Sequence, residues 1–261
     1  MPILFTEGEY KIEHPERSRG ITFCLFYFFL YTSCMLPELI PAVNAETFDE
    51  VKAKIKKVEP YAEGAVSAEG PDNGGIKWVH VDVADGSFTD VMLWHDPNDL
   101  LNLQTPLCVE VHLMIDRIDE RVADWLKPVV RRVIFHREAS ENPNVVIDAC
   151  RAADIQAGIA IKPDSSVDIV LPFLSKVDLV QTLAVVPGPS GQAFRSDTLQ
   201  KIAALHSAYP ACPIEVDGGV NSSTVGAIVK AGATILVAGA AIYGAADIKN
   251  AIEDLRRHAA E

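Results

Sequence analysis

Short runs of apolar and β-branched residues alternate along this chain with segments whose apolar residues recur at helical spacing. The apolar runs predict strands at residues 39–43, 78–83, 108–114, 132–136, 157–161, 179–185, 214–217 and 234–238. The intervening segments predict helices, among them 45–58, 144–153, 196–208, 222–231 and 248–258. Eight strand–helix units in about 225 residues, with strands apolar along their length, indicate an α/β protein with one closed (β/α)8 barrel, a TIM barrel.

Two segments do not follow this alternation. Residues 1–34 begin charged and irregular, and an apolar, aromatic stretch at 21–36 follows. That stretch is shorter than the ~20 residues of a membrane span, and the acidic residues before it do not suit a secretory signal. We interpret 1–34 as an N-terminal extension outside a barrel domain at 35–261, with an uncleaved anchor as the alternative and its presence in the native protein left open. Residues 62–75, rich in glycine and polar residues, are interpreted as a flexible insertion on the face away from the chemistry.

Composition limits the partners. The chain has 261 residues, 49% of them hydrophobic, which is enough for a large core. A formal net charge of −13 argues against nucleic acid as a ligand, because no basic stripe is present to neutralise phosphates. Five cysteines without CxxC spacing fit a reducing compartment, so we expect a cytoplasmic protein with no membrane partner. We also expect a homo-oligomer.

Histidines and aspartates end three of the predicted strands. His80 and Asp82 are two residues apart, so both project from the same face of their strand, and His112 and Asp217 end two other apolar runs. The carboxyl ends of the strands meet at the active-site face of such a barrel. Two imidazoles and two carboxylates there predict a site for one divalent metal ion (Zn, Mn, Fe or Co) in which a carboxylate can also move protons.

Turns that contain glycine follow the sixth, seventh and eighth predicted strands. Glycine lets the backbone approach an anion closely and point consecutive N–H groups at it. Three such turns side by side favour a phosphate site over ordinary tight turns. The candidate phosphate-binding residues are Gly188, Pro189, Ser190, Gly191, Gly218, Gly219, Gly239 and Ala240.

Five motifs in order, between about residues 39 and 255, resemble the ribulose-phosphate 3-epimerase family. They are Trp78-Val-His80-Val-Asp82-Val-Ala-Asp85-Gly86, Val111-His112-Leu-Met114, Phe135-His136-Arg-Glu138-Ala, Pro187-Gly188-Pro-Ser-Gly191-Gln192 and Glu215-Val-Asp217-Gly218-Gly219-Val. The resemblance implies an isomerase of the pentose phosphate pathway that binds a sugar phosphate. It implies one metal on His80, Asp82, His112 and Asp217, and inversion at C3 of D-ribulose 5-phosphate to give D-xylulose 5-phosphate. It also implies that Asp82 and Asp217 form the acid/base pair.

Departures from the family pattern concern the substrate. Ala42, Ala84, Leu183 and Ala240 stand where the family has serines or methionines. None is a proposed metal ligand, so the reaction type is kept and the identity of the sugar phosphate is left open. Asn44, Met114 and His136 are candidate substrate contacts, and for His136 a contact with substrate or with a metal ligand is favoured over direct metal binding.

Three other readings stay open. The chain could be an epimerase of another ketose phosphate, such as a hexulose 6-phosphate. It could be a phosphosugar lyase or decarboxylase, although that class normally has a lysine two residues after an aspartate such as Asp82, where this chain has Ala84. It could also be a non-catalytic phosphosugar-binding barrel, which would have no need of both aspartates.

Overall fold

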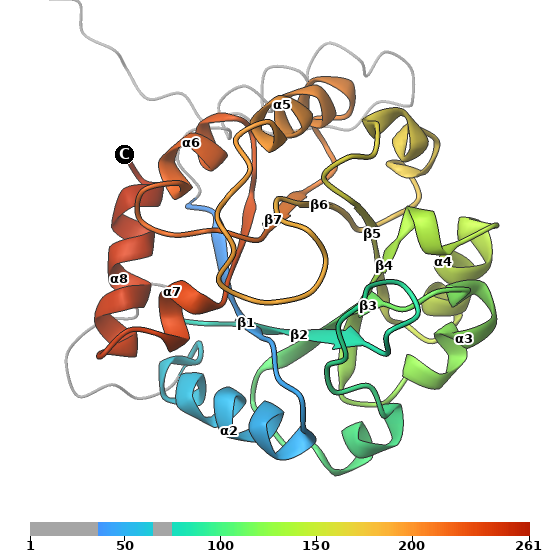
Figure 1. Cartoon of the computed structure of the whole chain (residues 1–261), viewed down its shortest axis with the longest axis horizontal. Coiled ribbons are helices and arrows are strands. Elements are labelled where there is room, and N and C mark those ends of the chain that lie inside the picture. The colour runs from blue at the N-terminus through green and yellow to red at the C-terminus, as the bar shows by residue number, and fades with distance from the viewer. Residues whose placement is uncertain (1–35, 65–74) are drawn as a thin grey trace, which may run out of the picture. The chain divides into compact units, whose positions relative to one another are not determined.

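A computed structural model describes residues 36–64 and 75–261 (Figure 1). Eight parallel strands form a barrel in chain order, which closes where β8 pairs with β1. The strands are β1 (Glu38–Val43), β2 (Trp78–Ala84), β3 (Cys108–Met114), β4 (Val130–His136), β5 (Gln156–Ile161), β6 (Leu179–Leu183), β7 (Ile214–Asp217) and β8 (Ile235–Ala238). The (β/α)8 prediction is confirmed.

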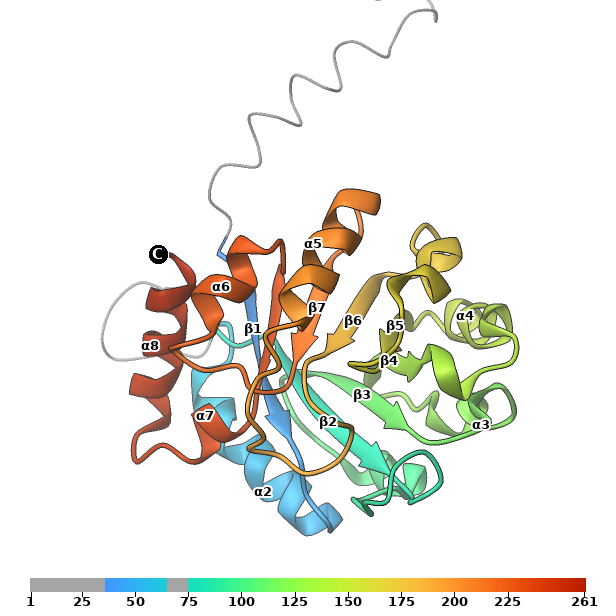
Figure 2. The ribbon, with the colours of Figure 1, turned by 45° about the horizontal axis from the view of Figure 1, so that its top comes forward.

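Helices surround the strands, and the loop between β6 and α5 lies across the centre of the barrel (Figures 1 and 2). The α-helices are α2 (Phe48–Val58), α3 (Ile118–Trp125), α4 (Pro143–Ala152), α5 (Thr198–Ala208), α6 (Val225–Lys230), α7 (Ala240–Tyr243) and α8 (Ile248–Ala259). Short 3-10 helices occupy Glu59–Tyr61, Pro97–Asn102, Arg137–Ala139, Val167–Ile169 and Leu171–Phe173. None of the helices within the described residues is long and apolar enough to cross a membrane.

Alternation along each strand separates two cores. On β2, Val79, Val81 and Val83 face outward and join the large apolar layer between strands and helices. Trp78 and His80, on the other face, point into the barrel, where a smaller apolar cluster fills the interior. This second face carries the functional side chains, because its upper positions open at the carboxyl ends of the strands.

Some helices and strands begin or end at other residues than predicted. The first helix begins at Phe48 rather than at residue 45, because the Thr47 side chain accepts a hydrogen bond from Glu50 N–H in a capping box. The sixth strand ends at Leu183, and 3-10 helices rather than α-helices follow β2 and β5. The predicted extension at 1–34 and most of the predicted insertion at 62–75 lie outside the described residues.

Candidate metal and substrate site

The four predicted metal-binding side chains converge at the carboxyl ends of β2, β3 and β7. Each offers one ligand atom, and these atoms lie within 4.8 Å of one another. His80 Nε2 lies 3.4 Å from Asp82 Oδ1 and 4.0 Å from Asp217 Oδ2. His112 Nδ1 lies 3.2 Å from Asp82 Oδ1 and 3.6 Å from Asp217 Oδ2. The two histidines therefore present different ring nitrogens to one point.

The donor set suits a divalent transition metal. His80 Nε2 is buried and forms no hydrogen bond with any residue that the structure describes, although it faces two carboxylates. A buried nitrogen without a partner is costly unless another group takes its lone pair. Two imidazole nitrogens and two carboxylate oxygens match the ligands of Zn, Fe, Mn and Co, so the residues present fit the predicted ion.

The carboxylates of Asp82 and Asp217 also favour a bound cation between them. Burial would raise the pKa of Asp82, but His112 and His80 outweigh burial and hold that pKa far below its usual value. Burial and, second, the negative charge of Asp82 raise the pKa of Asp217 to about 7. A divalent cation between the two carboxylates would oppose this repulsion and favour their charged forms.

His136 lies behind His112 rather than in the cavity lining. Its Nε2 is 2.9 Å from His112 Nε2, and its Nδ1 is 3.4 Å from a carboxylate oxygen of Glu138. The ring of Phe88 covers it, with ring centroids 4.6 Å apart. Chiefly because of burial, the pKa of His136 falls to about 4, so this ring is neutral at pH 7. His136 is thus placed to orient the ring of His112.

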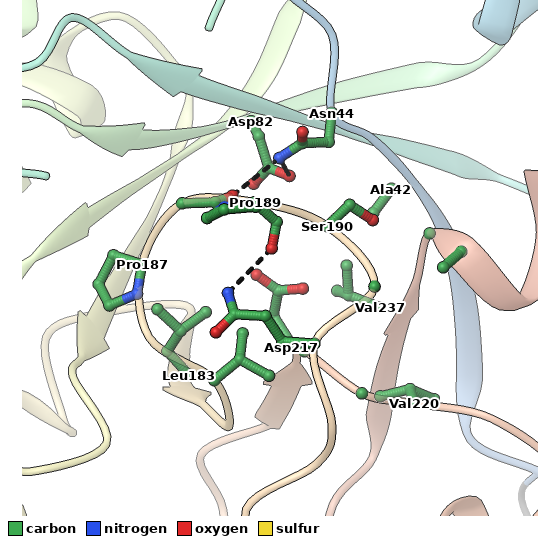
Figure 3. A pocket seen from close by; sticks show the side chains of 18 of the residues that line it. Ala42, Asn44, Asp82, Leu183, Pro187, Pro189, Ser190, Asp217, Val220 and Val237 are labelled. Atoms are coloured by element: carbon green, nitrogen blue, oxygen red, sulfur yellow. Dashed lines mark hydrogen bonds between the residues drawn. The ribbon is translucent and has the colours of Figure 1, made fainter. Parts of the chain in front are cut away.

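A cavity of about 190 Å³ opens above the metal residues at the mouth of the barrel (Figure 3). Asp82 and Asp217 line it, together with the predicted contacts Asn44 and Met114. All eight candidate phosphate-binding residues line the same cavity: Gly188, Pro189, Ser190, Gly191, Gly218, Gly219, Gly239 and Ala240. The acid/base candidates and the glycine turns therefore share one small space.

Asn44 links the two halves of this cavity. Its side-chain amide donates to Asp82 Oδ2 at 3.1 Å and to the carbonyl oxygen of Gly188 at 3.2 Å (Figure 3). The Thr89 hydroxyl donates to the carbonyl oxygen of Pro187 at 2.8 Å. The loop after β6 is thus fixed to the ends of β1 and β2, which places the glycine turn beside the carboxylates.

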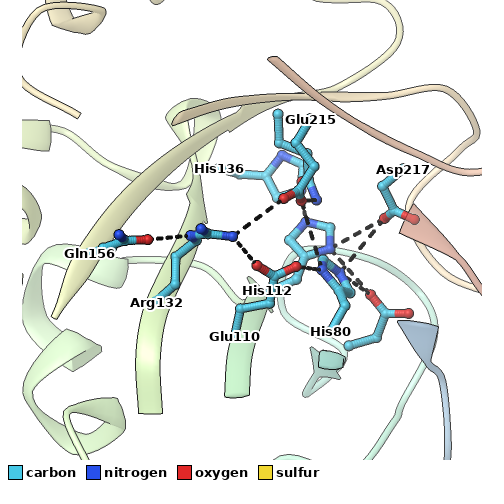
Figure 4. A network of polar contacts seen from close by, with 10 residues as sticks. His80, Glu110, His112, Arg132, His136, Gln156, Glu215 and Asp217 are labelled. Carbon is cyan, nitrogen blue, oxygen red and sulfur yellow. Dashed lines mark hydrogen bonds and ion pairs between the residues drawn. The ribbon is translucent and has the colours of Figure 1, made fainter. Parts of the chain in front are cut away.

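Sequence reasoning missed a layer of polar side chains inside the barrel, one level below the metal residues (Figure 4). Glu110 and Glu215 are fully buried there, and Arg132 is 6% exposed. The signal was present, because Glu110 precedes His112 by two residues and Glu215 precedes Asp217 by two. Each glutamate therefore shares its strand face with a metal-binding candidate.

Comparison with known proteins gives consistent results. Residues 60–243 match the model of the ribulose-phosphate 3 epimerase family. The chain is similar to a ribulose-phosphate 3-epimerase of Mycobacterium bovis, 36% identical over 190 residues that cover 71% of this chain and 83% of that protein. It is also similar to the ribulose-phosphate 3-epimerase, cytoplasmic isoform, of Oryza sativa subsp. japonica, 32% identical over 202 residues that cover 76% of this chain and 89% of that protein.

Among solved structures, the chain is similar to a 3-hexulose-6-phosphate synthase from Salmonella typhimurium. The TM-score is 0.60 at 14% identity, and the match covers 85% of this chain and 98% of that one. At this identity the likeness shows the barrel fold alone.

Proposed function

The chain belongs to the ribulose-phosphate 3-epimerase family, isomerases that act on carbohydrates, and from this premise we propose that it inverts C3 of D-ribulose 5-phosphate to give D-xylulose 5-phosphate. One observation carries the proposal. Asp82 and Asp217 approach a single cavity from β2 and β7, and the same cavity is lined by three glycine-containing turns (Figure 3). Carboxylates at one end and an anion cradle at the other suit a short sugar with a terminal phosphate.

Two carboxylates are what an inversion requires. One removes the proton from C3, and the other delivers a proton to the opposite face of the same carbon. A single base would return the proton to the side from which it came. The cation bound by the four converging residues would supply Lewis-acid stabilisation of the negative charge that develops when the proton leaves.

Backbone N–H groups are proposed to hold the phosphate. Gly218 and Gly219 follow β7 with φ of +103° and +68°, a region of backbone conformation that favours glycine. Successive N–H groups in such turns form concave anion sites. With a net charge of −13, the chain has no general positive field to attract a phosphate, so these local donors matter more.

Substrate choice within the ketose phosphates rests on the cavity wall. Ala42, Leu183 and Ala240, three of the four departures from the family pattern, line the cavity. Turnover of D-ribulose 5-phosphate should therefore be compared with that of a hexulose 6-phosphate under the same metal loading. A higher kcat/KM for the hexulose would reassign the substrate while leaving the reaction type.

The experiment that tests the two-base reaction is proton exchange in deuterated water. Asp82→Asn and Asp217→Asn should each lower turnover at least ~10²-fold, the usual loss when a positioned acid or base is removed. Metal content is measured in parallel, because both residues are proposed ligands. Asp85→Asn is the control, since Asp85 pairs with Arg121 at 2.7 Å and does not line the cavity.

The pattern of deuterium exchange then tests whether Asp82 and Asp217 hold the two acid/base roles. Wild-type product should carry deuterium at C3, and a single variant that keeps its metal should exchange substrate without inverting it. Inversion near the wild-type rate in either variant would show that the acid/base roles belong to other residues.

We further propose a cytoplasmic homo-oligomer whose catalytic domain is 35–261, with no catalytic part for 1–34 or for the insertion at 62–75. The kcat/KM of the full chain compared with that of a variant beginning at Met35 tests the first boundary, and a lower value for the shorter variant would count against it. Native mass measurement tests the oligomer, and a monomer at micromolar concentration would contradict it.

A further inference from the structure

A row of polar side chains crosses the inside of the barrel one level below Asp82 and His112. Strand register creates it, because His80 is paired with Glu110, Glu110 with Arg132, and Arg132 with Gln156 across β2, β3, β4 and β5. Three members of the row are buried, with His80 and Glu110 at 0% and Arg132 at 6% exposure, and Gln156 at its far end is exposed. Buried charge of this kind is costly and does little for stability that apolar side chains would not do better. Its position therefore calls for a functional explanation.

Glu110 fixes the ring of His80. The Nδ1 of His80 lies 2.7 Å from Glu110 Oε1, a distance at which His80 donates its N–H to the carboxylate (Figure 4). In the neutral ring with its proton on Nδ1, Nε2 is left to bind a cation, and this nitrogen faces Asp82 and Asp217 with no hydrogen-bond partner among the described residues. One carboxylate thus sets both the orientation and the tautomer of His80.

Arg132 holds Glu110 in turn. Its Nη1 donates to Glu110 Oε2 at 2.5 Å, and its Nε donates to Gln156 Oε1 at 2.9 Å. The guanidinium also lies over the ring of Trp78, 3.9 Å from the ring centroid. These contacts hold the guanidinium on several sides, and through it the Glu110 carboxylate.

Glu215, the other buried carboxylate of this layer, does not take the same part. Its Oε1 accepts a hydrogen bond from the Gln181 amide at 2.9 Å but lies 3.8 Å from His80 Nδ1. That distance is too long for a hydrogen bond. Its Oε2 is 3.9 Å from Arg132 Nη1. Glu215 is therefore a matched control for Glu110, with the same residue type and the same burial at the same level.

We propose that Glu110, held by Arg132, is a positioning residue of the metal centre that keeps His80 in the tautomer whose Nε2 can bind the metal. The inference rests on the metal site of the proposed function and adds to it two residues that touch neither metal nor substrate. Partners of this kind typically change metal affinity 10- to 100-fold when they are replaced.

Glu110→Gln gives a specific test, because the volume of the side chain is almost unchanged. Arg132 can only donate hydrogen bonds, so the new amide must turn its carbonyl oxygen toward Arg132 and its NH₂ toward His80. His80 Nδ1 must then accept, and the proton moves to Nε2, where it blocks the metal. We expect zinc affinity, measured by competition with a chelating dye, to fall 10- to 100-fold, against less than about 3-fold for Glu215→Gln.

A second readout does not depend on activity. In metal-free wild-type protein labelled with ¹⁵N-histidine, at a pH where the His80 ring is neutral, long-range ¹H–¹⁵N spectra should place the His80 proton on Nδ1. In metal-free Glu110→Gln above pH 8, the proton should lie on Nε2. The double variant Glu110→Leu with Arg132→Met controls for loss of folding, because it removes both charges and leaves no unpaired buried charge. It should unfold near the wild-type temperature yet bind zinc as weakly as Glu110→Gln.

The outcomes separate the two proposals. If wild-type protein binds no divalent ion, the metal of the proposed function and the positioning role of Glu110 are both overturned. Tight wild-type binding with equal affinities in Glu110→Gln and Glu215→Gln would overturn the positioning role alone. A wild-type His80 proton on Nε2 would also overturn it.

Discussion

Gly219 is the position where the phosphate turn depends most directly on the absence of a side chain. A Cβ added there would lie 2.5 Å from both the backbone nitrogen and the Cα of Phe194, in the loop after β6. Gly191 offers a matched comparison. Its φ of +85° is also in the left-handed region, as is the +68° of Gly219, but a Cβ there meets nothing within 4 Å.

Gly191→Ala and Gly219→Ala should therefore both lose stability through the backbone conformation, and Gly219→Ala should lose more through a steric contact. A left-handed backbone costs an L-residue about 1–2 kcal/mol, and this applies to Gly191→Ala and Gly219→Ala alike. Only Gly219→Ala adds a contact about 1 Å shorter than the carbon–carbon optimum, and overpacking of this kind costs about 1–3 kcal/mol more. Because the obstructing atoms are backbone, relief requires a shift of the loop itself. The expected losses are about 1–2 kcal/mol for Gly191→Ala and about 2–5 kcal/mol for Gly219→Ala.

Urea denaturation measures the first consequence and steady-state kinetics the second. A loop displaced by about 1 Å misplaces the phosphate donors, so Gly219→Ala should raise KM for the sugar phosphate at least ~10-fold, with a smaller change in kcat. Gly191→Ala should raise KM less. Equal losses of stability and equal KM values in the two variants would refute the reasoning, because they would show that the approach of the two loops has no energetic consequence.

Three further predictions use other parts of the molecule. Dialysis against a strong chelator should abolish epimerisation, and Zn, Mn, Fe or Co should restore it with about one ion per chain by elemental analysis; full turnover by metal-free protein would contradict this. Burial would raise the pKa of Glu138, but His136 and Ser165 outweigh burial and lower it to about 2, so the carboxylate stabilises the fold above pH 4.5 and loses this effect as pH falls toward 2. In denaturation of the metal-free protein, the free energy of unfolding of Glu138→Gln should be about 1–2 kcal/mol lower than that of wild type at pH 7, a figure that already allows for the partial exposure of Glu138. Near pH 2 the two free energies of unfolding should be almost equal. Burial raises the pKa of the Cys150 thiol to about 12, so iodoacetamide at pH 9 should modify the partly exposed Cys108 before Cys150, as peptide mass spectrometry would show.

The barrel and the convergence of the four candidate metal-binding residues were predictable because simple geometry connects them to the sequence. Period-two alternation places His80 and Asp82 on one face, and parallel strands of a barrel end at one rim. The same rule would have found Glu110, two residues before His112, had the interior been expected to hold charge. Its contact with His80 was not predictable, because that contact depends on the register between β2 and β3, which no local pattern encodes.

Side-chain conformation set a second limit to prediction from sequence. Both histidines of the metal site could be identified from the chain, but not the nitrogen that each presents. His80 turns Nε2 to the site because Glu110 holds its Nδ1, whereas His112 turns Nδ1 to the site because His136 lies 2.9 Å from its Nε2. In each case the neighbour behind the ring decides, and the two neighbours stand on different strands.

This arrangement explains why the centre of the barrel is polar at all. An apolar layer there would pack without buried charge, but it would leave Nδ1 of His80 without a partner, and an imidazole free to turn can present either nitrogen. Glu110 cannot serve alone, because an unpaired buried carboxylate is strongly destabilising, and Arg132 supplies the opposite charge at 2.5 Å. The requirement to orient one histidine therefore extends, contact by contact, from β2 through β3 and β4 to Gln156 on β5. We therefore expect substitutions in the layer beneath the candidate metal site to change the chemistry at the mouth of the barrel without reaching the substrate.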